Sequence, residues 1–300
     1  MNNSSAFDYI RNLYRTGGMT VRLIFVNTLF YILINVIQVY GRLMGDADVS
    51  LGSLLINVFA LKADFYSFVY SPWGLFTSIF SHFSFWHFAF NMVFLYFAGK
   101  MFEQLFDQKR LLYTYLLGGV LGGVLEIIAH LVFPSLQGNF PIVVGASGAI
   151  MAIFVALAFH RPNLEVRLLG LFPVKLIFLA VFFLLKDLLS LGMEDGTAHF
   201  AHLGGALLGV LSIYQLHKSS NVINKTQMIM DRLIAFFLNV FKSKPVFSKS
   251  NNRFKSDEEY NYESKNKQDT IDVILDKISK SGYDSLSKKE KDFLFKQSKK

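Results

Sequence analysis

The sequence predicts an all-α membrane protein, a bundle of six transmembrane helices with a short helical tail. Hydrophobic residues make up 52% of the chain and charged residues only 17%, against roughly 25% charged residues in soluble domains. Phe alone occurs 32 times. Apolar stretches long enough to cross a hydrocarbon core of about 30 Å recur along the chain. The predicted spans are residues 20–40, 83–102, 111–133, 144–159, 168–189 and 197–216.

Four segments follow from this reading. Residues 1–19 are polar and form an N-terminal segment, without the features of a cleaved signal peptide, so the first apolar run is expected to stay as an anchor. Residues 20–216 form the helical domain. Residues 217–268 form a basic amphipathic segment and a linker, and residues 269–300 form a helical hairpin.

The connection between the first two spans, residues 41–82, is too apolar for a solvated loop. It carries aromatic residues such as Phe65, Tyr66, Tyr70 and Trp73. Tyr and Trp prefer the headgroup level of a bilayer. We therefore expect this connection to lie in the membrane interface.

The Lys and Arg residues of the short connections set the orientation. Arg11, Arg15 and Arg22 precede the first span, and the next cationic connections lie on the same predicted side. Residues 134–143, on the other side, hold no Lys or Arg. We expect a multi-pass protein of the cell inner (cytoplasmic) membrane with both termini in the cytoplasm.

The positive charge of the chain lies in its tail. Residues 1–216 hold 12 Lys/Arg and 11 Asp/Glu, whereas residues 217–300 hold 18 and 11. Residues 228–241 are amphipathic and suited to an anionic lipid surface. Ile271, Ile274, Leu275 and Ile278 mark one face of a helix, and Ser287 with Glu290 forms a capping box before another. No nucleic-acid partner is expected, and the partner of the tail is left open.

The residue types present exclude several kinds of site. The chain has no Cys, so it has neither disulfides nor a thiolate nucleophile. No His is followed by Glu, which removes the zinc-protease motif H-E-x-x-H. Asp187 is the only Asp inside a predicted span, so a pair of membrane aspartates is absent. We expect no metal and no cofactor.

Polar groups inside a membrane are costly and each needs an explanation. Gly145-Ala146-Ser147-Gly148 opens the fourth span, after an irregular segment from Pro134 to Pro141. Small residues there can serve helix packing alone. Alternatively, Ser147 is a nucleophile at a helix N-terminus, where free N–H groups can hold an oxyanion.

Ala201-His202-Leu203-Gly204-Gly205, with Gly209, lies in the sixth span. A single membrane His can be a hydrogen-bonded packing group. However, Gly205 and Gly209 form a small-residue face that lets this helix touch another backbone. That approach can bring His202 to a serine, as nucleophilic catalysis requires. His199, on nearly the same face, is expected at the rim, and the alternative is that it is the base itself.

Two further pairs stand at i, i+4 spacing, which places both members on one helix face. His87 and Asn91, preceded by His82, suit an oxyanion or an interhelical hydrogen bond. Glu126 and His130 read as a structural or cavity-lining pair, or else as a proton relay.

Taken together, these motifs resemble the rhomboid family of intramembrane serine proteases, in a bacterial form with a C-terminal cytoplasmic extension. The family is similar in its six core spans, H-x-x-x-N in the second, G-x-S-G in the fourth and A-H-x-x-G in the sixth. The resemblance covers roughly residues 20–216. It implies a rhomboid-like bundle and a Ser–His dyad, without an acidic third member, that cleaves single-span membrane proteins in or near the bilayer.

The resemblance also assigns roles by position. Ser147 corresponds to the nucleophile and His202 to the general base. His87, Asn91 and the backbone of Ser147 correspond to the oxyanion hole, which Gly145 allows the chain to approach. The residues that correspond to structural or packing positions are His82, Glu103, Gly205 and Gly209. One departure is Trp73-Gly74, where family members often carry Trp-Arg.

Two other functions remain open from the residues alone. A catalytically silent rhomboid-like protein would bind client helices without cutting them, but such proteins usually lack the Ser or the His. A transporter could use Glu126 and His130 as a proton relay. Transporters often show repeated halves, and no internal repeat is visible here.

Overall fold

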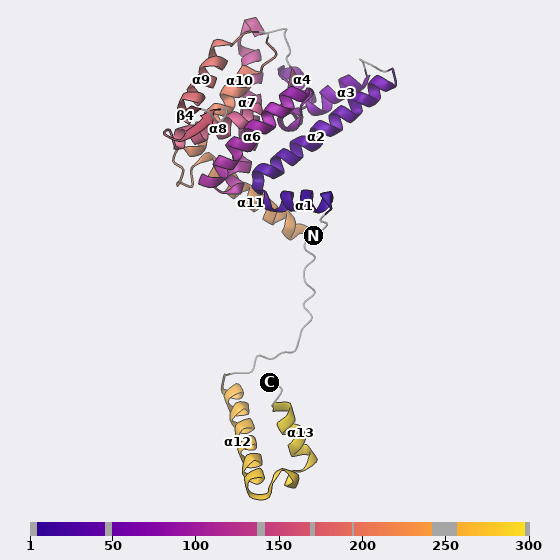
Figure 1. Ribbon diagram of the computed structural model, residues 1–300, viewed down its shortest axis with the longest axis vertical. Helices are drawn as coiled ribbons and strands as arrows, with labels where there is room; N and C mark the ends of the chain where they lie inside the picture. The colour runs from indigo at the N-terminus through magenta and orange to yellow at the C-terminus, as the bar shows by residue number, and fades with distance from the viewer. Residues whose placement is uncertain are drawn as a thin grey trace. The chain divides into compact units, whose positions relative to one another are not determined.

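The computed structural model describes residues 5–45, 50–136, 142–168, 172–193, 195–241 and 257–297. Contacts divide the chain into a first unit, Met1–Asn239, and a second unit, Val240–Lys300. The first unit is a helical bundle (Figure 1). Its long helices are α2 (Gly18–Leu43), α6 (Phe85–Leu105), α7 (Gln108–Val132), α8 (Ser147–His160), α9 (Leu176–Leu189) and α10 (His199–Ile213).

The centre of the bundle is formed by α7, α8 and α10, with α2, α6 and α9 packed around them (Figure 1). The buried core contains large side chains, among them Leu95, Phe102, Tyr115, Ile153 and Leu157. Many apolar side chains of α2, α6 and α9 are instead exposed on the outside of the bundle. Such an apolar exterior is what a lipid-facing surface requires.

Two helices, α2 and α7, are long and apolar enough to cross a membrane by length and composition, and α8 and α10 are shorter apolar helices. Each predicted span contains a helix. The fifth prediction, 168–189, is wrong at its start because α9 begins only at Leu176. Before it, β3 (Glu165–Leu168) and β4 (Phe172–Lys175) pair as an antiparallel hairpin. Pro173 lies in β4, and proline is poorly accommodated in a helix interior.

In its described residues, the connection after α2 contains three short helices, which the sequence did not predict. They are α3 (Ser50–Phe59), α4 (Phe65–Tyr70) and α5 (Gly74–Thr77), followed by the 3₁₀ turn η1 (Ser78–Phe80). Phe65, Tyr66, Tyr70 and Trp73 are exposed, and the Trp73 ring N–H donates to the carbonyl of Asn57 over 3.1 Å. Exposed aromatic rings on short helices fit an interfacial location.

The N-terminal segment, expected only to be polar, contains a helix, α1 (Ala6–Thr16). Ser5 and Asp8 form a capping box at its start, and Phe7, Ile10 and Leu13 are exposed. The next helix is fixed by Glu103, whose carboxylate accepts from the backbone N–H of Met19 and Thr20 over 2.5 and 3.1 Å. Glu103 therefore caps α2 from the end of α6, a structural role.

The amphipathic segment after the bundle forms α11 (Val222–Phe241), six residues longer at its start than residues 228–241. It is anchored by Arg110, a buried residue of α7. The Arg110 guanidinium donates to the Ser212 carbonyl, to Asn221 and to Asn224 over 2.5, 2.9 and 2.8 Å. The apolar side chains of α11 that stay exposed include Ile229, Leu233, Ile234 and Phe236.

The second unit is a helical hairpin of α12 (Asp257–Ser281), the turn η3 (Tyr283–Ser285) and α13 (Lys288–Gln297). Its first helix begins twelve residues before the expected boundary at 269, in the segment read as linker, and the rest of that linker lies outside the described residues. Ser287 and Glu290 form the expected capping box. Hydrogen bonds from Ser287, with Lys277 nearby, lower the pKa of Glu290 to about 2.

Two minor strands, β1 (Leu61–Lys62) and β2 (Ile142–Val143), join the first connection to the segment before α8. The irregular segment expected from Pro134 to Pro141 is described only through the turn η2 (Pro134–Leu136), and residues 137–141 lie outside the described residues. The β1–β2 pair therefore gives the backbone before Ser147 a fixed partner.

The contact between α8 and α10 is close enough to make a stability prediction. A Cβ added at Gly205 would collide with the carbonyl of Gly148. We expect Gly205→Ala to lower the free energy of unfolding by about 1–3 kcal/mol through overpacking and to lower the Tm in detergent.

Gly52→Ala is the matched control, because nothing lies within 4 Å of a Cβ added at that helical position. Equal Tm values for Gly205→Ala and Gly52→Ala would contradict a tight contact between α8 and α10.

Candidate active site

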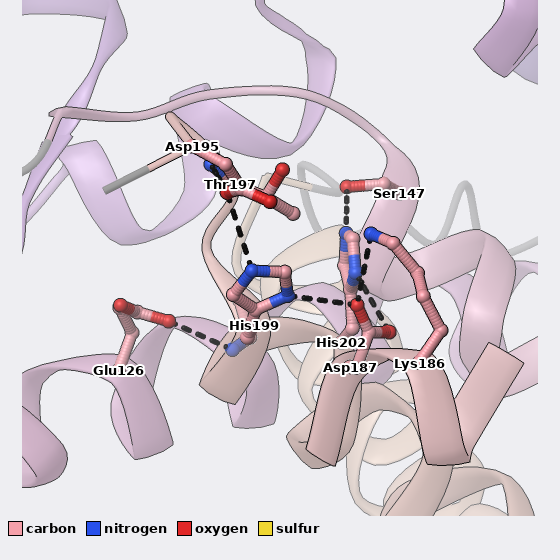
Figure 2. A network of polar contacts seen from close by, with 9 residues as sticks. Glu126, Ser147, Lys186, Asp187, Asp195, Thr197, His199 and His202 are labelled. Atoms are coloured by element: carbon pink, nitrogen blue, oxygen red, sulfur yellow. Dashed lines mark hydrogen bonds and ion pairs between the residues drawn. The ribbon is translucent and has the colours of Figure 1, made fainter. Parts of the chain in front are cut away.

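Ser147 and His202 face one another across the contact between α8 and α10. Ser147 is the first residue of α8, and His202 lies in the first turn of α10. The Ser147 hydroxyl Oγ lies 2.8 Å from His202 Nε2 (Figure 2). The two residues are 55 positions apart in the sequence, so the fold creates this contact. A hydroxyl hydrogen-bonded to an imidazole is the minimum arrangement for an activated serine.

Glycines allow this contact by bringing the helix backbones together. A Cβ at Gly205 would meet the Gly148 carbonyl, one at Gly209 would lie 2.6 Å from the Ala152 carbonyl, and one at Gly204 2.8 Å from Gly122 Cα. In a membrane, such small-residue faces let helices approach to van der Waals contact of their backbones. The close approach sets the separation of Ser147 and His202.

The residues expected for an oxyanion hole lie beside Ser147. Gly145 has a φ of +116°, and a Cβ there would meet the His87 ring at 2.7 Å and Asn91 Nδ2 at 3.5 Å. Asn91 Nδ2 donates one hydrogen bond to the His87 carbonyl over 3.0 Å. His87, Asn91 and Ser147 line the same cavity. Donors gathered around one point, next to a helix N-terminus, suit a developing negative charge.

The segment that enters α8 is held by the end of the first connection. The backbone N–H of Ala146 donates to His82 Nε2 over 3.4 Å, and that of Gly145 donates to the Ser78 carbonyl over 2.9 Å. His82 is fully buried. Besides lying at the end of the first connection, as expected, His82 thus fixes the backbone next to the candidate nucleophile.

Glu126 and His130 of α7 lie apart from the Ser147–His202 contact. Glu126 Oε2 accepts from the backbone N–H of Ala201 over 2.9 Å, and His130 Nδ1 lies 2.9 Å from the Glu126 carbonyl. Both residues line a separate cavity of about 380 Å³. Glu126 therefore caps the start of α10, one residue before His202.

Asp187 is a member of this site that was not predicted from the sequence. Its carboxylate Oδ2 lies 3.0 Å from His202 Nδ1, and Oδ1 lies 2.9 Å from His199 Nδ1 (Figure 2). His199, expected at the rim, is instead only 3% exposed. An ionisable residue inside a membrane segment is a functional candidate by default, so the isolated Asp187 was the available signal.

Asp187, His199 and His202 also form a group of metal-ligand type, with ligand atoms within 4.8 Å of one another. Each Nδ1, however, lies at hydrogen-bond distance from its own carboxylate oxygen. The other nitrogen of His202 faces Ser147. The arrangement therefore satisfies these atoms as hydrogen bonds, without requiring an ion.

Two cavities meet at Ser147 and His202. The larger, of about 610 Å³, is lined by polar groups including His87, Asn91 and Thr197. The smaller, of about 250 Å³, is lined mainly by apolar side chains such as Ile150, Phe154 and Phe183. A polar cavity admits the water that hydrolysis consumes, and an apolar one accepts an apolar side chain.

The chain is similar to known families in two regions. A family model described as "Rhomboid domain" matches residues 70–219, half of the chain. That range includes every candidate site residue described above. A second model, described as a family of unknown function (DUF6576), matches residues 255–300. That match begins close to the start of α12 at Asp257.

Curated relatives agree with the first match. RHOMBOID-like protein 12, mitochondrial, of Arabidopsis thaliana is 33% identical over 48% of this chain and 46% of its own length. Presenilin-associated rhomboid-like protein, mitochondrial, of Homo sapiens is 32% identical over 47% and 37%. Rhomboid-like protein 11, chloroplastic, of Arabidopsis thaliana is 33% identical over 47% and 51%. The chain thus matches about half or less of the length of these relatives.

The fit between Gly145 and His87 gives a prediction for the reactivity of Ser147. Gly145→Ala adds a Cβ against the His87 ring at a backbone conformation that L residues rarely adopt. We expect the rate of Ser147 labelling by a serine-reactive fluorophosphonate to fall about 10- to 100-fold.

Gly192→Ala is the control, because Gly192 also has a positive φ, +82°, but nothing lies within 4 Å of its added Cβ. A labelling rate for Gly145→Ala equal to the rates of Gly192→Ala and the wild type would contradict the role of the contact with His87.

Proposed function

Because the chain belongs to the rhomboid family, we propose that it is an intramembrane serine endopeptidase that cleaves transmembrane proteins in or near the bilayer. The chain is accordingly a multi-pass helical membrane protein. The observation that carries the proposal is the 2.8 Å contact between Ser147 Oγ and His202 Nε2 at the start of α8. The sixth-span motif alone would not predict that these two atoms lie at hydrogen-bond distance.

The proposed reaction follows from the placement of these groups. His202 Nε2 takes the proton of the Ser147 hydroxyl as its oxygen attacks the scissile carbonyl. His87, Asn91 and the Ser147 backbone N–H are placed to hold the oxyanion that forms. His202 then gives the proton to the leaving amine, and water hydrolyses the acyl-enzyme to restore Ser147.

We propose single-span membrane proteins as substrates. The smaller cavity is lined by Phe94, Ile150 and Phe154, next to Ser147, and its apolar lining suits an apolar substrate side chain. The larger cavity offers polar groups for the cleaved backbone and for water. Membrane lipid is the other expected partner, along the apolar exterior and the exposed apolar side chains of α11. No nucleic-acid partner is expected.

A cleavage assay tests the proposal directly. In proteoliposomes with a single-span reporter, Ser147→Ala and His202→Ala should abolish cleavage, because they remove the nucleophile and its base. Asn91→Ala should retain cleavage at a rate lowered by about 10²–10³, the usual effect of losing one oxyanion donor.

Fluorophosphonate labelling of Ser147 accompanies this assay, since a poor reporter would hide an active enzyme. Cleavage by wild type and Ser147→Ala at equal rates would contradict the mechanism. Absence of both cleavage and labelling in the wild type would favour the silent client-binding protein instead.

We also propose that the protein spans an inner (cytoplasmic) membrane six times, with both termini in the cytoplasm. The chain lacks Cys, so one introduced thiol is a unique label. Tyr283 of the tail and Met193 after α9 are both exposed. The positive-inside rule places them on opposite sides of the membrane.

In intact bacterial cells, a membrane-impermeant maleimide should therefore label Met193→Cys. Tyr283→Cys should be labelled only after the membrane is permeabilised, and the Cys-free wild type should stay unlabelled in both conditions. The reverse pattern for the two variants would overturn the orientation.

A further inference from the structure

We propose that Asp187 is a third member of the site, a positioning residue that holds the His202 imidazole in the orientation and tautomer that Ser147 requires. The site then works as a Ser–His–Asp group, in place of the dyad that the family resemblance implies. This inference rests on the proposed function, since it describes how the same serine is activated.

A line of contacts runs from Asp187 through His202 to Ser147. Asp187 Oδ2 lies 3.0 Å from His202 Nδ1, and His202 Nε2 lies 2.8 Å from Ser147 Oγ. An ionised carboxylate can only accept hydrogen bonds, so it keeps the proton on Nδ1. The lone pair of Nε2 is then free to accept the Ser147 proton, and no other tautomer of neutral His202 satisfies both partners.

Asp187 is also deeply buried. Its side chain is 2% exposed and lies in the last turn of α9. A carboxylate so far from water needs partners for both oxygens. Oδ1 and Oδ2 have His199 and His202, and Lys186 Nζ lies 3.7 Å from Oδ1. One oxygen is thus committed to the imidazole that contacts the candidate nucleophile.

His199 fixes the orientation of the Asp187 carboxylate. His199 Nδ1 lies 2.9 Å from Asp187 Oδ1, which turns Oδ2 toward His202 (Figure 2). His199 Nε2 lies 3.2 Å from Asp195 Oδ1 in the loop before α10, an ion-pair distance without the geometry of a hydrogen bond. The backbone N–H of Thr197 donates to Asp195 and lowers its pKa. The contacts therefore run from Asp195 through His199, Asp187 and His202 to Ser147.

This arrangement has a defined role in the reaction. When Ser147 attacks, its proton moves to His202 Nε2 and the imidazole becomes a cation. Asp187, whose side chain is 2% exposed, stays ionised and offsets that charge at 3.0 Å. The proton then leaves with the amine product, so Asp187 itself neither gains nor loses a proton.

The test is Asp187→Asn in the full chain, in proteoliposomes, with the single-span reporter. The amide can turn its NH₂ toward His202 Nδ1 and favour the wrong tautomer. We expect kcat to fall about 10²-fold or more, with KM changed less than about threefold. Fluorophosphonate titration should still count the same fraction of reactive Ser147, and the labelling rate constant should fall in step with kcat.

Glu126→Gln is the matched control. Glu126 is also a buried carboxylate, 3% exposed, and it bonds the backbone of Ala201 beside His202. It touches neither His202 nor Ser147 by a hydrogen bond among the described contacts. We expect its kcat to stay within about threefold of wild type.

Each other outcome has a distinct meaning. Wild-type kcat in Asp187→Asn, with wild-type cleavage intact, would overturn the positioning role and leave the proposed function standing. A loss of titratable sites that matches the loss of kcat would also overturn it, since the carboxylate would then serve folding. A wild type that neither cleaves the reporter faster than Ser147→Ala nor is labelled at Ser147 would overturn both proposals.

A metal site is the remaining alternative for these three residues. Wild-type activity that is abolished by a chelator and restored by Zn²⁺ would assign Asp187, His199 and His202 to an ion and overturn the positioning role. We expect cleavage and Ser147 labelling to continue unchanged in the chelator.

Discussion

The close approach of α8 and α10 is the constraint on which the site depends. Gly205 of α10 lies against the carbonyl of Gly148, and Gly209 against that of Ala152, so neither position can carry a side chain without movement. In a membrane, apolar side chains gain nothing by leaving lipid for protein, and close packing of backbones holds helices together. The 2.8 Å contact of Ser147 and His202 is a consequence of this packing.

Polar groups then fix the ends of the helices. Glu103 accepts from the first turn of α2, Glu126 from the start of α10, and Arg110 binds the segment between α10 and α11. Each of these charged side chains ties two segments distant in the sequence. Because an unpaired backbone N–H or a lone charge is costly in an apolar bundle, these ties hold the helix ends in place. Non-helical backbone lies just before Ser147 and just before His199, and it lines the larger cavity, which admits water.

The apolar stretches were visible in the sequence because a helix needs about 20 apolar residues to cross a membrane. The sequence prediction failed where local structure competed with hydropathy. The predicted fifth span begins at residue 168, but Leu168 pairs with Phe172 in a hairpin in which Pro173 also takes part. The helix α1 was missed because its alternation of aromatic and charged residues is short, although its capping box at Ser5 and Asp8 was readable.

Residue order alone shows which residue types stand at the helix starts and where the glycine faces lie. Spacing along one helix places His87 beside Asn91 and His202 beside Gly205, and these relations need no tertiary structure. Which groups meet across helices depends instead on how the helices pack. Asp187 is 15 residues from His202 and 12 from His199, on a different helix, and the rotation and depth of α9 against α10 set that contact. No periodicity records the relative rotation of two packed helices, so the sequence could show an isolated aspartate but not its partner.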